Sequence, residues 1–346
     1  MTVLFSPAAP VASSSVYFSK EYGEATVVGR AGGWINLSAL DGRCQIPLIL
    51  TPLESGGFEA SSPYGYSGIY ASPDVSEGSL AATWANALEV LRLHGVVSVF
   101  LRYPPFGDGT EDRFRELSEM ALENVSGTIS VLTPDSASVW SAMQGRARTA
   151  VRKAERLGMS SSVETASPAA LEVGGAFRTL YEGTMRRVDA ASHHFYSDSY
   201  YEMLSDFLGD RLQLVTVRNA EGIVVAAALV LVDDNIVHYH LSGSNPVEAR
   251  NGANNLLIWA LLRWSADNGY ASAHLGGGTS AEDSLYKFKA SFGGASLQFT
   301  VGKVIVNPER YWALVAAKAA ALGCSTDDLI ATKFFPAFRA DWNPDV

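Results

Sequence analysis

The stretch NIVHYHLSGSNPVEARNGANNLLIWALLRWSADNGYASAHLGGG, residues 235–278, decides the fold. Residues 235–246 are β-branched and aromatic and end in turn residues, which predicts a strand. Residues 252–269 have the apolar pattern of a helix and a closing glycine. Residues 270–278 return to a strand that runs out into three glycines. The stretch therefore predicts a strand–helix–strand unit of an α/β protein.

The same order of elements occurs in the first half of the chain. Residues 79–103 predict a helix followed by a buried strand. The 17 positions that separate Ser67 from Trp84 also separate Ser242 from Trp259. Because the spacing is kept although few residues are identical, we interpret the two stretches as copies of one unit. The alternative is the alternation of strands and helices that α/β proteins commonly show.

Composition and charge narrow the class of protein. A chain of 346 residues is about the right length for two domains, and 47% hydrophobic against 18% charged residues indicates a large core. The net charge of −10 argues against a protein that coats nucleic acid or an anionic membrane. Two distant cysteines, no basic leader and no apolar run of membrane-spanning length predict a protein of the reducing cytoplasm.

A basic segment separates the two halves. Residues 136–159 predict a linker helix on which Arg148, Arg152 and Arg156 form a stripe at four-residue spacing. On an acidic protein such a cluster is a candidate site for a phosphate-bearing partner. The alternative is an ordinary solvated helix face.

The stretch LGGGTSAEDSLYKFKASFGG, residues 275–294, carries two lysines on one predicted helix. Thr279 and Glu282 have the spacing of a capping box, so the helix is expected to begin near Ser280 and to end at Gly293.

The two lysines of this helix are not equivalent. At roughly 100° per residue, Lys289 lies about 65° from the centre of the apolar face and Lys287 about 130° from it. Lys287 is therefore expected in solvent, whereas Lys289 lies where the glycine-rich strand end leaves an opening in the sheet. There its ammonium can stabilise charge on a substrate oxygen or take part in proton transfer. The alternative is a lysine whose stem only covers the core.

Other kinds of site find little support. Neither GxGxxG nor GxxxxGK[ST] occurs, so no nucleotide is predicted. His238, His240 and His274 on adjacent strands could gather around a metal, but strand histidines are more often satisfied by hydrogen bonds, and no metal is predicted. The absence of GxSxG, and of a histidine near either cysteine, disfavours covalent catalysis and favours direct attack of one substrate on another.

Several motifs together resemble one known family. They are the basic linker helix, LYEGTMRR (180–187), FYSDSYYEML (195–204), YHLSGS (239–244), LGGG and DSLYKFKASFGG; SPYGYSG and VFLRYPP match more weakly in the first half. The combination resembles the FemABX family of aminoacyl-transferring enzymes, from about residue 60 to 312, and in particular its compact members with two tandem GNAT-like domains.

This resemblance implies an α/β (α+β) fold of two tandem GNAT-like domains, each a mixed central sheet flanked by helices. The predicted domains are 1–140, a basic linker helix at 141–159, and 160–346 with the catalytic helix. It also implies transfer of an amino acid from aminoacyl-tRNA to an amine of a peptide, a peptidoglycan precursor or a peptidyl natural product, without a cofactor. The family's Phe-Lys pair falls on Phe288 and Lys289.

Three departures from related proteins qualify the resemblance. GNAT enzymes that use CoA bind its pyrophosphate with a [QR]-x-x-G-x-[GA] loop, but here Ala249 stands three places before Gly252, which disfavours acetyl-CoA. No heptad pattern indicates the coiled coil of some members, and Ile69 replaces a common proline. These two differences affect the tRNA contact and the acceptor pocket.

The leading hypothesis is amide formation by direct attack of an amine on an aminoacyl ester, with Lys289 stabilising the oxyanion and the glycines leaving room for the substrate carbonyl. The alternatives are an acyl-CoA or acyl-carrier N-acyltransferase acting on an amino sugar or small amine, and a non-catalytic double-GNAT binding module. The candidate substrate-binding residues are Tyr64, Tyr66, Arg102, Arg148, Arg152, Arg156, Tyr239, Ser242, Gly276, Gly277, Gly278 and Tyr286.

Overall fold

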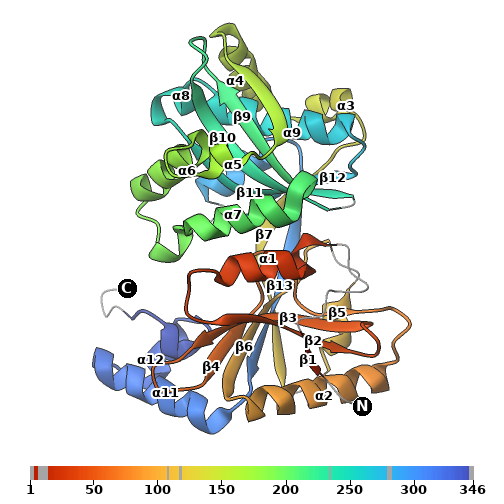
Figure 1. Cartoon of the computed structure of the whole chain (residues 1–346), viewed down its shortest axis with the longest axis vertical. Coiled ribbons are helices and arrows are strands. Elements are labelled where there is room, and N and C mark those ends of the chain that lie inside the picture. Colours follow the sequence, from red (N-terminus) through yellow and green to blue (C-terminus); the bar gives the residue numbers. More distant parts are fainter. Residues whose placement is uncertain are drawn as a thin grey trace. The chain divides into compact units, whose positions relative to one another are not determined.

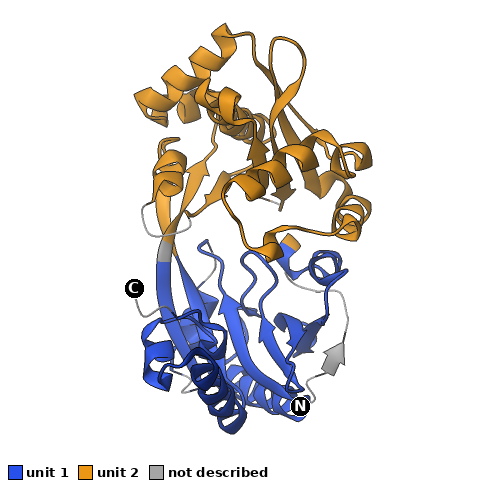
Figure 2. Cartoon of the chain, turned by 90° about the vertical axis from the view of Figure 1, so that its left-hand side faces the viewer, with its two compact units in different colours: residues 1–13, 17–125, 299–346 blue, residues 14–16, 126–298 orange. Residues whose placement is uncertain are grey.

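The computed structural model describes residues 4–6, 15–106, 109–116, 119–233, 235–278 and 283–342. The chain divides into two compact units (Figure 2). Unit 1 comprises residues 1–13, 17–125 and 299–346, and unit 2 comprises residues 14–16 and 126–298. Strands β7 (Met120–Leu132) and β13 (Ala295–Ile305) each begin in one unit and end in the other.

Unit 1 is built on a mixed sheet in the order β1-β2-β3-β4-β6-β13. Its strands and helices (Figure 1) are β1 (Leu4–Ser6), α1 (Lys20–Val27), β2 (Gly33–Ala39), β3 (Cys44–Pro52), β4 (Phe58–Ser61), β5 (Tyr70–Ala71), α2 (Glu77–Leu93), β6 (Val96–Arg102), α11 (Pro308–Leu322) and α12 (Thr326–Ala331). Strands β4 and β6 are parallel. The other neighbouring pairs in this order are antiparallel. Helix α2 makes the crossover that a parallel pair requires.

Helices cover both faces of the unit 1 sheet. Leu80, Trp84 and Leu91 of α2 pack with Leu48 and Val99 in one core. Tyr311 and Val315 of α11 pack with Leu329 of α12 and Val97 of β6 in a second core. Val96 and Val97 are adjacent in β6 and belong to different cores, because neighbouring side chains of a strand point to opposite faces of the sheet. Helices α11 and α12 lie together (Figure 1).

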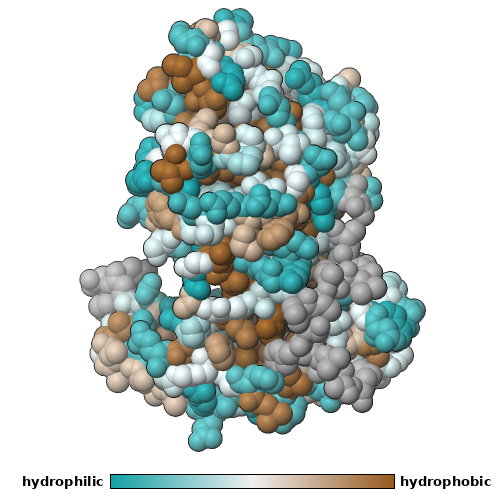
Figure 3. Space-filling view, viewed as in Figure 1, coloured by the Kyte–Doolittle hydropathy of each residue, from teal (hydrophilic) through white to brown (hydrophobic). Residues whose placement is uncertain are grey.

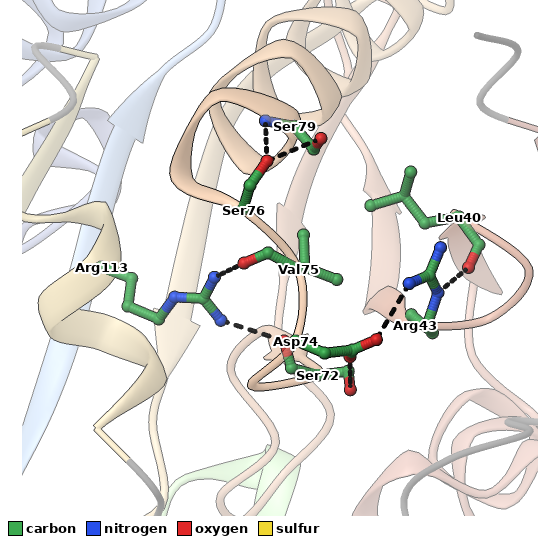
Figure 4. A network of polar contacts seen from close by, with 8 residues as sticks. All are labelled: Leu40, Arg43, Ser72, Asp74, Val75, Ser76, Ser79 and Arg113. Carbon is green, nitrogen blue, oxygen red and sulfur yellow. Dashed lines mark hydrogen bonds and ion pairs between the residues drawn. The ribbon is translucent and has the colours of Figure 1, made fainter.

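An arginine network fixes the loop that leads into α2 (Figure 4). The guanidinium of Arg113 donates to the carbonyl oxygens of Ser72 (3.1 Å) and Val75. Asp74 in the same loop accepts from Arg43 (3.0 Å), and Ser76 then caps α2 by accepting from the backbone N–H of Ser79. The start of α2 is thereby tied to two distant parts of the chain.

Unit 2 repeats the design with the strand order β7-β12-β11-β10-β9-β8. Its further elements are α3 (Ser136–Ala142), α4 (Gly145–Arg156), β8 (Ser160–Thr165), α5 (Pro168–Leu171), α6 (Ala176–Arg187), α7 (Asp198–Leu208), β9 (Leu212–Arg218), β10 (Val224–Val232), β11 (Ile236–Ser244), α8 (Pro246–Arg250), α9 (Ala253–Asp267), β12 (Ser272–Gly276) and α10 (Ser284–Ala290). Strands β11 and β12 are parallel and are joined through α9.

Helix α9 is the centre of the unit 2 core. Its residues from Leu256 to Leu262 are all buried, because the strands pack on it from one side and α3 and α4 from another. In β10, Ala226, Ala228 and Val230 belong to this core, and the strand also contacts α6. A helix segment that is apolar all round, as residues 256–262 are, is typical of one enclosed between two layers.

The structure confirms the predicted fold class and most element positions. The two strand–helix–strand units are β4-α2-β6 and β11-α9-β12. In each unit the first and last strands pair in parallel. The predicted helices 79–95 and 252–269 correspond to Glu77–Leu93 and Ala253–Asp267.

Two predictions about domain organisation need correction. The predicted C-terminal domain 160–346 is too long, because residues 299–346 belong to unit 1, where β13 pairs with β6. The predicted linker helix is two helices of unit 2, separated by extended backbone at Met143 and Gln144. Ala147, Val151 and Ala154 of α4 are buried in the unit 2 core, so α4 is part of a domain and not a linker.

The helix that carries Lys289 also begins later than predicted. Helix α10 starts at Ser284 with Asp283 as its N-cap, and Gly293 follows it in the left-handed conformation. The predicted capping box, Thr279 to Glu282, lies outside the described residues.

The surface shown in Figure 3 mixes hydrophilic residues with separate hydrophobic areas. Within the described part of the chain, no helix combines the length and the apolar character needed to cross a membrane.

Candidate active site

The centre of unit 2 contains an opening between two parallel strands. Strands β11 and β12 pair from Ile236 and Ser272 as far as His238 and His274. Beyond this point β11 continues against β10 up to Ser244, while β12 continues against β7 up to Gly276. Because each strand keeps its outer neighbour, the two strands part after the histidine pair.

Lys289 of α10 reaches this opening. Its side chain is only 8% exposed, and Nζ donates a hydrogen bond of 2.7 Å to the carbonyl oxygen of Gly277 at the end of β12. The same ammonium lies 5.8 Å from the centroid of the Tyr239 ring on β11, within the range of a cation–π contact. Lys289 therefore contacts both strands that border the opening.

Burial changes the acid–base behaviour of Lys289. Desolvation lowers the pKa of Lys289 from 10.5 to about 8, and the charge of Asp283 opposes this change. At neutral pH the side chain is still mainly an ammonium, but it loses its proton more readily than a surface lysine. Such a group can donate a hydrogen bond to a developing oxyanion in a site of low dielectric constant.

The three glycines after β12 make room for other protein groups. A Cβ atom at Gly276 would lie 3.5 Å from Nζ of Lys289, and one at Gly278 would lie 2.1 Å from Oδ1 of Asp283. A Cβ at Gly277 would lie 3.1 Å from the carbonyl oxygen of Gly127. The sequence suggested room for a substrate, whereas the structure shows that Lys289, Asp283 and Gly127 occupy the space beside these glycines.

Aromatic side chains support α10 and border the opening. Tyr286 donates to Ser296 Oγ at 2.7 Å, and Phe288 packs edge-on against Phe292 at 5.4 Å at the margin of the core. Burial raises the pKa of Tyr239 to about 12, and the hydrogen bond with Ser242 opposes this change. Tyr239 and Ser242 therefore lie together with neutral side chains at pH 7.

The three strand histidines are engaged within the protein. His238 is 1% exposed, and its Nε2 lies 3.2 Å from Oδ2 of Asp233. Tyr200 Oη lies 2.8 Å from Nε2 of His240, and burial lowers the pKa of His240 to about 3. Burial also lowers the pKa of His274 well below its ordinary value. In the described ranges no group of three His, Cys, Asp or Glu residues could hold a metal ion.

The predicted basic stripe on α4 divides into two kinds of residue. Nη1 of Arg148 donates to the carbonyl oxygens of Trp140 (3.2 Å), Ser141 (2.9 Å) and Met143 (2.6 Å). Arg148 thus closes the end of α3, and we withdraw it from the phosphate-binding candidates. Arg152 and Arg156 are exposed beside a shallow depression, and Arg152 lies 5.3 Å from the centroid of Trp140.

Comparisons with known proteins show which folds this chain is similar to. Residues 141–289 match the family described as acetyltransferase (GNAT) domain. The structure is similar to that of FemX, with a TM-score of 0.63 and 13% identity over 83% of this chain and 92% of the other. It is also similar to L-PGS from Bacillus licheniformis (TM-score 0.55, 14% identity, 82% and 90% coverage).

A third similar structure is a tandem GNAT protein from the clavulanic acid biosynthesis pathway (TM-score 0.50, 14% identity, 80% and 84% coverage). The chain has a FemABX-like tandem GNAT fold. The matched GNAT domain contains α4, the strand opening and Lys289, and it supports an acyltransferase. No curated protein matches the sequence.

Helix α4 packs on the start of α9, where the sequence lacks the CoA signature. Gly252 is the N-cap of α9 in a left-handed conformation, and a Cβ atom there would lie 2.3 Å from the carbonyl oxygen of Ala150 in α4. Lys153 of α4 donates to the carbonyl oxygen of Arg250 at 2.9 Å. The backbone of α4 thus lies directly against the turn on which the CoA signature of GNAT enzymes would fall.

The first GNAT-like unit brings three predicted residues together at the corresponding strand end. Strands β4 and β6 pair as far as Ser61 and Phe100, and the Oγ of Ser62 then accepts from the backbone N–H of Arg102 at 3.1 Å. Burial raises the pKa of Tyr66 to about 12, the charge of Tyr64 adds to this, and Arg102 opposes it. Tyr64, Tyr66 and Arg102 are therefore electrostatic neighbours.

Sequence reasoning missed two groups that shape these sites. Asp283 was overlooked because Thr279 and Glu282 offered a competing cap signal, although an Asp three residues before Tyr286 is itself a cap pattern. Phe299 packs edge-on against Tyr66 at 5.4 Å, from a segment more than two hundred residues later in the chain. No local pattern could indicate that contact.

Proposed function

We propose that this protein is an aminoacyltransferase that forms an amide bond by direct attack. The observation that carries the proposal is the buried ammonium of Lys289 in the opening between β11 and β12. It supports a reaction in which negative charge develops on a carbonyl oxygen. The GNAT domain match and the FemABX-like fold support the same general chemistry.

In the proposed reaction an uncharged acceptor amine attacks the ester carbonyl of an aminoacyl-tRNA. The new C–N bond forms, the carbonyl oxygen becomes an oxyanion, and Lys289 donates a hydrogen bond to it. The C–O bond to the ribose then breaks, and the proton lost by the amine nitrogen ends on the released ribose hydroxyl. The products are an amide and a free tRNA, and no covalent enzyme intermediate is needed.

The donor is assigned from the FemABX resemblance and the basic residues of α4. Arg152 and Arg156 are exposed and lie four residues apart, so they share one face of α4. Their positive charges can bind the phosphates of a tRNA. The contact between α4 and Gly252 argues against a CoA pyrophosphate at the start of α9. The acceptor is proposed to be an amine-bearing peptide, a cell-wall precursor or a peptidyl natural product.

The test compares donors directly. Purified protein is incubated with labelled aminoacyl-tRNA, with the same tRNA after ribonuclease treatment, or with labelled acyl-CoA, each with a panel of amine-bearing peptides. We expect amide product only with intact aminoacyl-tRNA. Product formed from acyl-CoA, or equal product after ribonuclease treatment, would contradict the proposal and favour the N-acyltransferase alternative. Absence of binding to every acceptor and donor would contradict both enzymatic proposals.

A further inference from the structure

The carboxylate of Asp283 lies beside the Lys289 site and has no part in the chemistry described above. We propose that Asp283 is a positioning residue for Lys289: its carboxylate, seated against Gly278, places a negative charge beside the segment at the end of β12 on which the lysine ammonium is held. This inference rests on the proposed function for its catalytic meaning, but its physical content concerns Lys289 alone.

The first support is steric. Asp283 Oδ1 accepts a hydrogen bond of 2.7 Å from the backbone N–H of Tyr286, which fixes the carboxylate at the start of α10. A Cβ at Gly278 would lie 2.1 Å from Oδ1 and 2.7 Å from Oδ2, so this carboxylate is packed against the backbone that leaves β12. On the same glycine segment, Gly277 accepts from Nζ of Lys289. Asp283 and Lys289 thus flank residues 276–278.

The second support is the balance of charge around Lys289. The ring of Tyr239 faces the ammonium from β11, and burial keeps that phenol neutral. His274 is the titratable neighbour on β12, and burial keeps it neutral as well. Lys287, on the same helix, is exposed. Among the described residues, Asp283 is the group whose charge counteracts the desolvation of Lys289.

The third support is the choice of residue at the cap. Other helices of this chain begin with uncharged N-caps that accept the same kind of backbone hydrogen bond, for example Ser76, Ser197 and Asn307. Asn, Ser and Asp cap helices about equally well. The start of α10 therefore needs a side-chain acceptor, and the negative charge is an additional property that acts on Lys289.

The test separates the charge from the cap. Asp283→Asn keeps an N-cap acceptor and removes the charge, and Asp135→Asn makes the same change at the N-cap of α3 as a matched control. The readout is the pH dependence of trace acetylation of Lys289, quantified by mass spectrometry. Chymotrypsin cleaves after Phe288 and so separates Lys289 from Lys287, which serves as the exposed reference.

We expect Asp283→Asn to shift the labelling midpoint of Lys289 downward by about one pH unit, a tenfold change in the ammonium-to-amine ratio, and Asp135→Asn to leave it unchanged. The alkaline limb of the pH profile of the transfer rate should move to lower pH by the same amount. Gly278→Ala, which displaces the carboxylate without removing it, should give a shift of the same sign. A Lys289 midpoint that is unchanged or raised in both variants would overturn the inference. Because labelling needs no turnover, this result is distinct from a failure to transfer amino acids.

Discussion

The ends of the parallel strand pairs in the two units share one framework and differ in the side chains beside them. In unit 1 the parallel pair β4 and β6 ends beside Tyr64, Tyr66 and Arg102, and a serine hydroxyl accepts from the backbone where the strands end. In unit 2 the pair β11 and β12 ends beside Lys289, which α10 supplies. The fold therefore provides a parallel strand end twice, and one short helix places a buried ammonium at the strand end of unit 2.

The largest expected effect follows from removing the ammonium. Lys289→Met is expected to lower kcat about a hundred- to a thousandfold, the usual cost of losing one oxyanion donor. Lys287→Met, two residues away on the exposed side of the same helix, should keep nearly full activity. The measurement is single-turnover transfer from aminoacyl-tRNA. Equal losses in both variants would show that the helix as a whole, and not the buried ammonium, distinguishes unit 2 from unit 1.

The same substitution should change how stability depends on pH. The pKa of Lys289 is about 8 in the folded protein and 10.5 ordinarily, so between these values the unfolded chain binds more protons and stability rises with pH. At pH 7 the buried ammonium costs about 3 kcal/mol, which Lys289→Met removes.

Urea unfolding of wild type and Lys289→Met at pH 7 and pH 10 measures this effect. The variant should be the more stable protein at pH 7, and its advantage should shrink at pH 10. A difference that does not change with pH would mean that Lys289 is not desolvated as its burial indicates.

A smaller effect is expected on donor affinity. Changing both Arg152 and Arg156 to Glu should weaken aminoacyl-tRNA binding about tenfold at physiological salt. It should also reduce the magnitude of the slope of log K against log salt concentration by about one to two. The control changes Arg92 and Arg186 to Glu, which gives the same net charge on helices α2 and α6. If both pairs have the same effect, general charge and not the α4 face attracts the donor.

The smallest effect is expected at the strand end of unit 1. Arg102→Met should raise KM for the acceptor several-fold and leave kcat almost unchanged, because a binding contact made equally in ground and transition states affects KM alone. Steady-state kinetics with saturating donor test this. A fall in kcat comparable with that of Lys289→Met would show that Arg102 takes part in the chemistry.

Much of the fold was accessible from local patterns. Trp84 and Trp259 stand at matching places in helices that each follow one strand and precede a parallel partner. Lys289 could be separated from Lys287 because helical angles depend only on residue spacing, and the structure confirms that Lys289 is buried and Lys287 exposed.

What local patterns could not supply depends on tertiary contacts. Arg148 has the spacing of a basic surface stripe, but its guanidinium is taken up by carbonyl oxygens at the end of α3. The domain boundary was misplaced because Val301 pairs with Arg102, 199 positions earlier in the chain. Residue patterns within a short stretch of sequence do not indicate so distant a strand pairing. The α10 cap was misread because two capping patterns overlap within five residues.

That distant pairing also sets an order of events during synthesis. The strand β13 that completes the unit 1 sheet leaves the ribosome only after residues 126–298 have been made. Unit 2 closes its own contacts within that intervening stretch, so it can fold while the growing chain still holds unit 1 without its last strand. The edge of β6 therefore stays unpaired until β13 has been made. During this time the nascent protein is most vulnerable to aggregation through its first half.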